Sequence, residues 1–195
     1  MTTIPRSLLT ADEFLEMAES DGHELVDGQL VEVAMGMESN WYGGELFGEV
    51  REHVKANDLG RAFPQDSGIQ VWDDDPNRVR KPDLSYFKKG RIPEPMLRGW
   101  IRVVPDLVAE VVSPNDLAEA LQRKIRDYRN AGVGLIWVIY PDTRTAYVYR
   151  RGHPIREVEA DGTLDGEDVL PGFSLSLAAL FATAQGQAPP PAEAS

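Results

Sequence analysis

The hydrophobic pattern is clearest over residues 103–132. A nearly unbroken apolar run at 107–112 predicts a strand that is buried on both faces, and Glu110 interrupts this run. A helix is then predicted to begin near residues 113–115, with an apolar stripe at steps of three and four that comprises Leu117, Leu121, Ile125 and Tyr128. Lys124 falls inside the stripe and is therefore expected to point inward. A buried acid and a buried lysine in consecutive elements would account for each other as a pair.

The remaining pattern predicts helices and strands in an order typical of an α/β domain. Thr10 and Glu13 stand at capping-box spacing, so a helix is expected to open at residue 11 and to stop near 20–22. Asp27-Gly28 predicts a hairpin between two short strands. A second helix is expected at 41–56, and further strands at 62–72, 81–87, 134–140, 145–150 and 155–159. This order favours a mixed central β-sheet flanked by helices, with an N-terminal helix and β-hairpin.

The composition is that of an ordinary globular protein. A chain of 195 residues with 42% hydrophobic and 27% charged residues is long enough for one well-cored domain. We expect this domain at residues 1–183 and a disordered tail, rich in Ala, Pro and Gln, at 184–195. The lack of cysteine excludes disulfides, zinc–thiolate sites and thiol nucleophiles. No stretch resembles a signal peptide or a membrane span, so we expect a cytoplasmic protein without a membrane partner.

The net charge of −12 argues against a constitutive nucleic-acid binder, because DNA or RNA would be repelled overall unless a local basic patch or bound divalent cations offset the charge. One stretch is locally basic and flanks Asp83 in sequence: Arg78, Arg80, Lys81, Lys88, Lys89, Arg91, Arg98 and Arg102. These side chains would either approach a phosphate backbone or balance nearby acids, and the sequence leaves both interpretations open.

Three acids stand in strand contexts, namely Glu24, Asp83 and Glu110. Carboxylates that meet at one sheet edge repel each other unless a divalent cation lies among them, and oxygen-rich sites suit magnesium or manganese. Such a cation would activate water and stabilise charge on a phosphoryl group, and Lys124 would assist. The alternative is structural: a buried Glu110–Lys124 ion pair, a turn acid at Asp83 and a solvated hairpin residue at Glu24.

These residues also carry a family resemblance. Pro82-Asp83 followed by Glu110 resembles the PD-(D/E)xK nuclease motif, although Val112 stands where that motif has lysine. The ordered set HELVDGQL, KPDLSYF, PDLVAEVVSPND, DYRNAGV and IWVIYP resembles the Uma-two family of restriction endonucleases over roughly residues 10–180. In that family the lysine has migrated onto the following helix, where this chain has Lys124.

The resemblance implies a restriction-endonuclease-like fold, dependence on Mg²⁺ or Mn²⁺, and cleavage of DNA. It implies a catalytic site of Asp83, Glu110, Lys124 and Glu24, in which the three acids bind the metal or support its ligands. A homodimer is expected, because cutting two strands needs two sites. Two alternatives stay open: a catalytically inactive nuclease-fold module for binding or regulation, and a structural subunit. The inactive module is motivated by the acidity of the chain, by Val112, and by Tyr42, which stands where the family often has histidine.

Overall fold

The computed structural model describes residues 8–33, 36–95 and 98–185. Helices of the α type are α1 (Ala11–Glu16), α2 (Met37–Ala56), α3 (Ala118–Ala131) and α4 (Leu177–Ala182), and short 3-10 helices are η1 (Ala18–Ser20) and η2 (Thr183–Gln185). The strands are β1 (His23–Val26), β2 (Gln29–Glu32), β3 (Gly60–Pro64), β4 (Leu84–Lys88), β5 (Leu107–Val111), β6 (Leu135–Tyr140), β7 (Thr145–Arg150), β8 (Arg156–Val158), β9 (Thr163–Asp165) and β10 (Ser174–Ser176). None of the helices in these ranges has the length and apolar character needed to cross a membrane.

A six-stranded mixed sheet forms the centre of the fold, in the order β3-β4-β5-β6-β7-β8. Only β5 and β6 are parallel, and their register places Glu110 opposite Val138. The other neighbours are antiparallel, as hairpin and loop connections permit. The predicted mixed sheet is therefore confirmed, with β5 as one of its two central strands.

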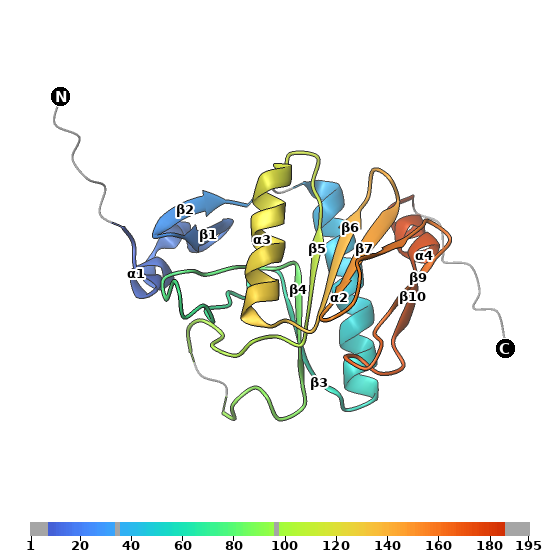
Figure 1. Ribbon diagram of the computed structural model, residues 1–195, viewed down its shortest axis with the longest axis horizontal. Coiled ribbons are helices and arrows are strands. Elements are labelled where there is room, and N and C mark those ends of the chain that lie inside the picture. The colour runs from blue at the N-terminus through green and yellow to red at the C-terminus, as the bar shows by residue number, and fades with distance from the viewer. Residues whose placement is uncertain (1–7, 34–35, 96–97, 186–195) are drawn as a thin grey trace.

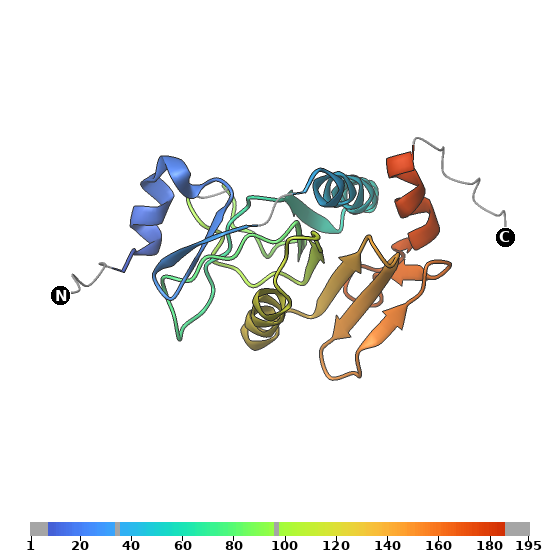
Figure 2. The ribbon, with the colours of Figure 1, turned by 90° about the horizontal axis from the view of Figure 1, so that it is seen from above.

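The two faces of this sheet are covered by different helices, as Figures 1 and 2 show for α2 and α3. Leu107 and Ala109 of β5 belong to the hydrophobic cluster that includes α2, whereas Val108 belongs to the cluster that includes Ile125 of α3. Because strand side chains alternate between faces, Glu110 lies on the same face as Val108 and points to α3. The alternation of β5 therefore sets the direction of the Glu110 side chain without any polar contact.

The predicted hairpin is confirmed by β1 and β2, which pair antiparallel about Asp27 and Gly28. These two residues have φ of 51° and 69°, the left-handed values that a two-residue turn of this kind requires. The predicted capping box at Thr10 is also present, although α1 ends at Glu16, because Met17 is extended. β9 and β10 form a small antiparallel sheet that the hydrophobic pattern did not indicate.

Several predicted boundaries are wrong for local reasons. The helix expected near 113–115 begins at Ala118, because the carboxylate of Asp116 accepts the backbone N–H of Ser113 at 2.7 Å and holds a turn there. Leu117 is 72% exposed and does not belong to the buried stripe. The strand expected at 62–72 ends at residue 64, and beyond it only Ile69 forms isolated bridges.

Two other boundaries also move. The helix expected from residue 41 starts at Met37. The expected disordered tail begins at 184, but η2 includes residues 184 and 185, and the rest of that tail lies outside the described residues.

Candidate active site

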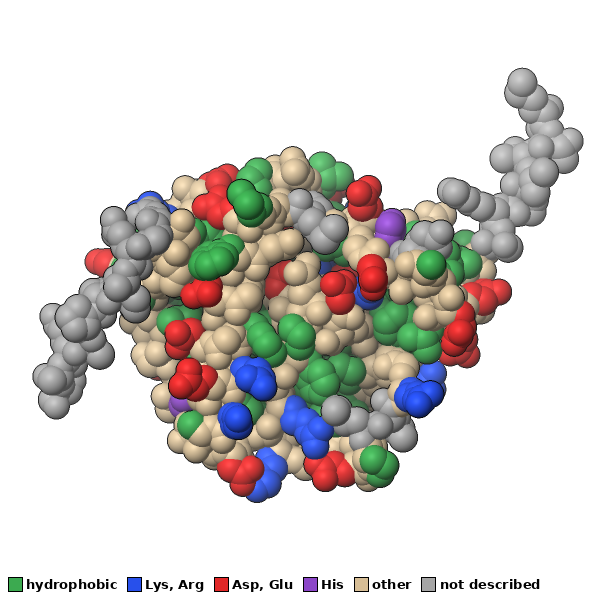
Figure 3. Space-filling model, turned by 180° about the vertical axis from the view of Figure 1, so that it is seen from behind, with side chains coloured by type: hydrophobic (Ala, Val, Ile, Leu, Met, Phe, Trp, Pro, Cys, Tyr) green, Lys and Arg blue, Asp and Glu red, His purple; other side chains and the backbone are tan. Residues whose placement is uncertain are grey.

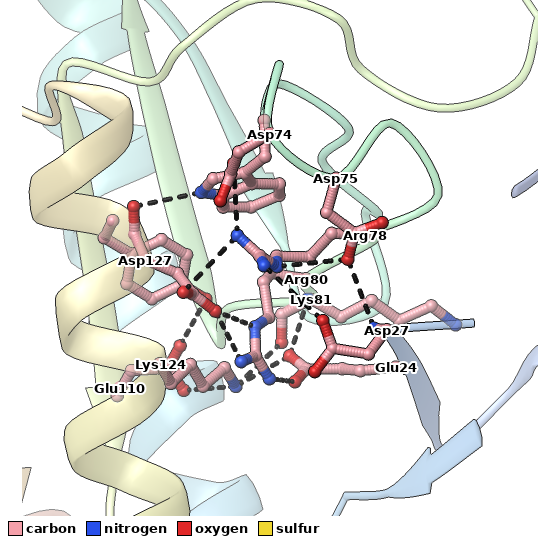
Figure 4. A network of polar contacts seen from close by, with 12 residues as sticks. Glu24, Asp27, Asp74, Asp75, Arg78, Arg80, Lys81, Glu110, Lys124 and Asp127 are labelled. Atoms are coloured by element: carbon pink, nitrogen blue, oxygen red, sulfur yellow. Dashed lines mark hydrogen bonds and ion pairs between the residues drawn. The ribbon is translucent and has the colours of Figure 1, made fainter. Parts of the chain in front are cut away.

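Four side chains from four distant segments line one small cavity of about 80 Å³. Glu24 comes from β1, Asp83 immediately precedes β4, Glu110 comes from β5 and Lys124 comes from α3. These are the four residues singled out from the sequence, and the structure brings them together. Figure 4 shows three of them, Glu24, Glu110 and Lys124, with the cations and acids around them.

Lys124 is the centre of the cluster. Its ammonium donates to Glu110 Oε2 at 2.8 Å and lies 3.0 Å from Glu24 Oε1, so it joins two buried carboxylates. The second oxygen of Glu110 accepts the hydroxyl of Tyr128 at 2.7 Å. Two side chains in the apolar stripe of α3, those of Lys124 and Tyr128, thus end in polar groups, and both contact Glu110. Sequence reasoning placed Tyr128 in the stripe but missed its hydroxyl contact.

Glu24 is held by a second cation, Arg80, whose role the sequence left open. Arg80 donates to Glu24 Oε2 at 2.8 Å, and the backbone N–H of Lys81 donates to Glu24 Oε1 at 2.7 Å. Arg80 also donates through Nε to Asp127 of α3 at 2.9 Å. This buried arginine therefore ties β1 to α3 across the cavity. Asp127 follows Lys124 by three residues, a helical spacing that is the one sequence signal for this contact.

The ion-pair network continues from Asp127 to an acidic turn at residues 73–75. Arg78 lies 3.6 Å from Asp127 and 3.5 Å from both Asp74 and Asp75. The side chain of Asp74 is 74% exposed, whereas that of Asp75 is only 15% exposed. Asp75 also accepts the backbone N–H of Asp27 at 3.1 Å, so it fastens the β1–β2 turn to the rest of the domain.

The basic stretch around Asp83 is largely neutralised. Six of its eight cations form ion pairs with acids, namely Arg78, Arg80, Lys81, Lys89, Arg91 and Arg102. The structure therefore favours the second sequence interpretation for these six side chains. They balance nearby acids rather than form a free phosphate-binding patch.

Asp83 lies where β4 and β5 meet. Its Oδ2 accepts the backbone N–H of Val111 at 2.6 Å, so the strand partner fixes the carboxylate at the cavity. Burial raises the pKa of Asp83 to about 6, and the charges of Asp116 and Glu24 act in the same direction, against Lys124 and the Val111 amide. Asp116, which sequence reasoning did not single out, lines the same cavity.

The cluster as a whole carries more negative than positive charge. Burial raises the pKa of Glu110 to about 8, and the charges of Asp83 and Glu24 add to the effect despite Lys124. For Lys124, burial would lower the pKa, but Glu110, Glu24 and Asp83 outweigh it and raise the pKa. Burial would likewise raise the pKa of Glu24, but Lys124 and Arg80 prevail and lower it. At Glu24 the nearby cations thus outweigh burial, whereas at Asp83 and Glu110 burial outweighs Lys124.

The metal-free protein is expected to lose thermal stability as the pH rises from 4.5 towards 8. The folded state holds the Glu110 proton more tightly than the unfolded state, so this contribution is complete below pH 4.5 and is lost by about pH 8. Each pKa unit corresponds to about 1.4 kcal/mol. We expect Tm, measured with a chelator present, to decrease over this range, and the decrease to be smaller in Glu110→Gln. Equal pH slopes in the two proteins would contradict the assignment.

The carboxylates of this cavity suit a divalent cation only in part. Within the described residues, no three His, Asp or Glu side chains are arranged around one metal position. The contacts explain this, because both oxygens of Glu24 contact cations and Lys124 lies between Glu24 and Glu110. Asp83 and Glu110 do fit a hard cation, since both supply carboxylate oxygens to one cavity, where burial raises the pKa of each. Glu24 is suited to support rather than to ligate.

A mixed sheet between helices, with carboxylates and a lysine converging where β4 and β5 meet, defines a protein of the restriction-endonuclease-like fold. The chain belongs to the Uma2 family, whose description is "Putative restriction endonuclease" and whose model matches residues 11–178. A crystal structure of a protein from Anabaena variabilis, described as a "putative nuclease", is similar with a TM-score of 0.76 and 24% identity, over 89% of this chain and 98% of that chain. A comparison with curated proteins finds no match.

Proposed function

We propose that this protein is a divalent-metal-dependent endonuclease that hydrolyses phosphodiester bonds in DNA. The observation that carries the proposal is the joint cavity of half-buried Asp83 and buried Glu110, two carboxylates with raised pKa values beside the Lys124 ammonium. The membership of the chain in a family described as restriction endonucleases supports the same reaction. Mg²⁺ or Mn²⁺ is the cofactor that this donor set suits.

The residues divide the chemical work according to their contacts. Asp83 and Glu110 would hold the cation, which when bound lowers the pKa of water and neutralises charge on phosphoryl oxygens. Lys124 is a fixed positive charge at the same cavity, suited to stabilise the negative charge that develops on the phosphate. Glu24 would position Lys124, since it contacts Lys124 at 3.0 Å and Arg80 at 2.8 Å. The backbone of Val111 would keep Asp83 in place.

The test is cleavage of duplex DNA by the purified full chain. We expect nicked or linear products from supercoiled plasmid in the presence of Mg²⁺ or Mn²⁺, and none with a chelator, because Asp83 and Glu110 need a cation to act on a phosphodiester. Sedimentation of the same sample would test the homodimer that double-strand cutting favours. Cleavage of equal rate in the chelator would refute a metal mechanism.

A second candidate is a module of the same fold that binds without turnover. The specific observation in its favour is that Lys124 already neutralises Glu24 and Glu110 internally. Calorimetric titration would separate the two candidates. Saturable Mg²⁺ or Mn²⁺ binding, lost in Glu110→Gln, with no cleavage of DNA or RNA would favour the binding module, whereas binding with cleavage would favour the nuclease.

A further inference from the structure

Exposed arginines gather at the C-terminal half of α3, away from the carboxylate cavity. Arg126 and Arg129 of α3 and Arg151 from the turn after β7 line a cavity of about 450 Å³. None of its lining residues is acidic: the others are Asn130, Val133, Arg150, Gly152 and His153. Arg123 lies one helical turn before Arg126 and continues the row. We call Arg123, Arg126, Arg129 and Arg151 the arginine ridge.

The arginine ridge is a cluster of basic side chains without acidic partners in the described structure. Its four guanidinium groups make no ion pair with any residue in the described ranges, although the chain has 32 acids against 20 Lys and Arg. Arg150, which lines the same cavity, is by contrast paired with Glu167 and Asp168. An acidic protein that leaves four neighbouring arginines unpaired on one surface has a concentrated positive patch in an otherwise repulsive field.

The fold explains why the ridge is exposed. Ile125 and Tyr128 are the buried residues of α3, whereas Arg123, Arg126 and Arg129 lie on the exposed face of the helix. At the helix end, a Cβ built on Gly132 would lie 3.5 Å from Arg151 Nη1, which places that guanidinium over the C-cap. The negative end of the helix dipole favours cations in the last turn and suits Arg129 and Arg151, but it does not reach Arg123 or Arg126. The helix dipole therefore does not account for all four arginines of the ridge.

We propose that the arginine ridge binds phosphate groups of a nucleic-acid backbone. This inference rests on the proposed nuclease function and assigns part of its substrate contact to a surface outside the catalytic cavity. Guanidinium groups match phosphate oxygens in two-point contacts, and three of them follow one helix at steps of about 4.5 Å. The same helix carries Lys124 on its inner side, so α3 links backbone docking to the carboxylates. The ridge lies on the α3 side of the sheet, opposite the α2 side shown in Figure 3.

The experiment measures binding rather than cleavage. A fluorescent DNA duplex is titrated with the full chain in a chelator, at several salt concentrations. The test variant is Arg126→Glu/Arg129→Glu. The matched control is Arg51→Glu/Lys55→Glu, which makes the same charge change at two exposed positions of α2 that form no ion pair within the described structure. Circular dichroism and Tm confirm that both variants fold.

We expect the ridge variant to bind at least tenfold more weakly and its salt slope to fall by about two, since each phosphate contact contributes about 0.9 to the slope. The control should keep its affinity within about twofold. An equal loss in the control would mean that net charge alone sets binding and would overturn the proposal. Competition by polyglutamate as strong as by DNA would indicate an acidic protein partner instead, and competition by inorganic phosphate at equal concentration would indicate a free-anion site.

Failure of this inference is distinguishable from failure of the proposed function. If the wild type binds no duplex in the chelator but cleaves plasmid with Mg²⁺, the ridge proposal is wrong and the nuclease proposal stands. If the wild type binds through the ridge but does not cleave with either metal, the surface assignment stands and the nuclease proposal is wrong.

Discussion

Asp83→Asn is expected to lower DNA cleavage by more than about 100-fold while leaving the protein folded. Changes to groups that merely orient metal ligands cost about 10- to 100-fold, so the loss of a direct ligand should exceed this range. The fold should tolerate the change, because the pKa of Asp83 is raised to about 6 and its Oδ2 contact with the Val111 N–H can be kept by an amide oxygen. We expect Tm at pH 8 to be unchanged or higher, since a half-buried charge is removed.

The matched control is Asp106→Asn. Asp106 accepts a backbone N–H from Lys88 at 2.8 Å and pairs with Arg91, but it lies outside the carboxylate cavity. The Asp106→Asn variant should cleave DNA at the wild-type rate. If Asp83→Asn cleaves as fast as this control under saturating Mg²⁺, Asp83 is a structural acid and the catalytic assignment is wrong. Titration of Mn²⁺ into both variants supplies a second readout that does not depend on turnover.

Arg80→Met is expected to lower the free energy of unfolding by about 3–5 kcal/mol, the cost of leaving a buried carboxylate without its partner. The side chains of Arg80 and Glu24 are 6% and 4% exposed, and Asp127 on the same guanidinium is 14% exposed. Methionine fills a similar volume but removes both contacts, so the loss is electrostatic more than a matter of packing. Urea denaturation followed by circular dichroism measures the effect.

Arg91→Met is the control for this change. Arg91 pairs only with Asp106 within the described structure, and its side chain is 40% exposed, so the expected loss is below about 1 kcal/mol. Arg80→Lys should fall between the two, because lysine keeps the charge but lacks the planar guanidinium that holds Glu24 through Nη1 and Asp127 through Nε and Nη2. A loss from Arg80→Met no larger than that from Arg91→Met would show that the buried network contributes little to stability.

Much of the site could be predicted from two anomalies in the hydrophobic pattern. Glu110 interrupts a strand that is otherwise apolar, and Lys124 interrupts the apolar stripe of the next helix. Burial of an unpaired charge is costly, so each anomaly requires a partner. The structure joins them at 2.8 Å. The helix period turns Lys124 towards the sheet, and the packing of α3 on the face of β5 that carries Val108 and Glu110 brings the two side chains together.

Other parts of the site depended on contacts between segments far apart in the chain. Arg80 stands in a run of basic residues and looks like part of a surface patch, but it contacts Glu24 at a separation of 56 residues. No local period specifies that contact. The same is true of Arg78, which approaches both Asp127 on α3 and Asp27 on the hairpin turn. The sequence therefore did not show which cations form internal ion pairs and which stay unpaired at the arginine ridge.

The sequence by itself determined most of the elements, the mixed sheet, and the inward-facing acid and lysine, because these follow from hydrophobic periods and turn chemistry over short stretches. Only the tertiary structure decided how charge is shared. It bound Glu24 to two cations, left Asp83 and Glu110 with raised pKa values, and separated a neutralised basic stretch from an unpaired one on α3. The physical reason is that ion pairs and burial depend on distances in space, which segments tens of residues apart acquire only on folding.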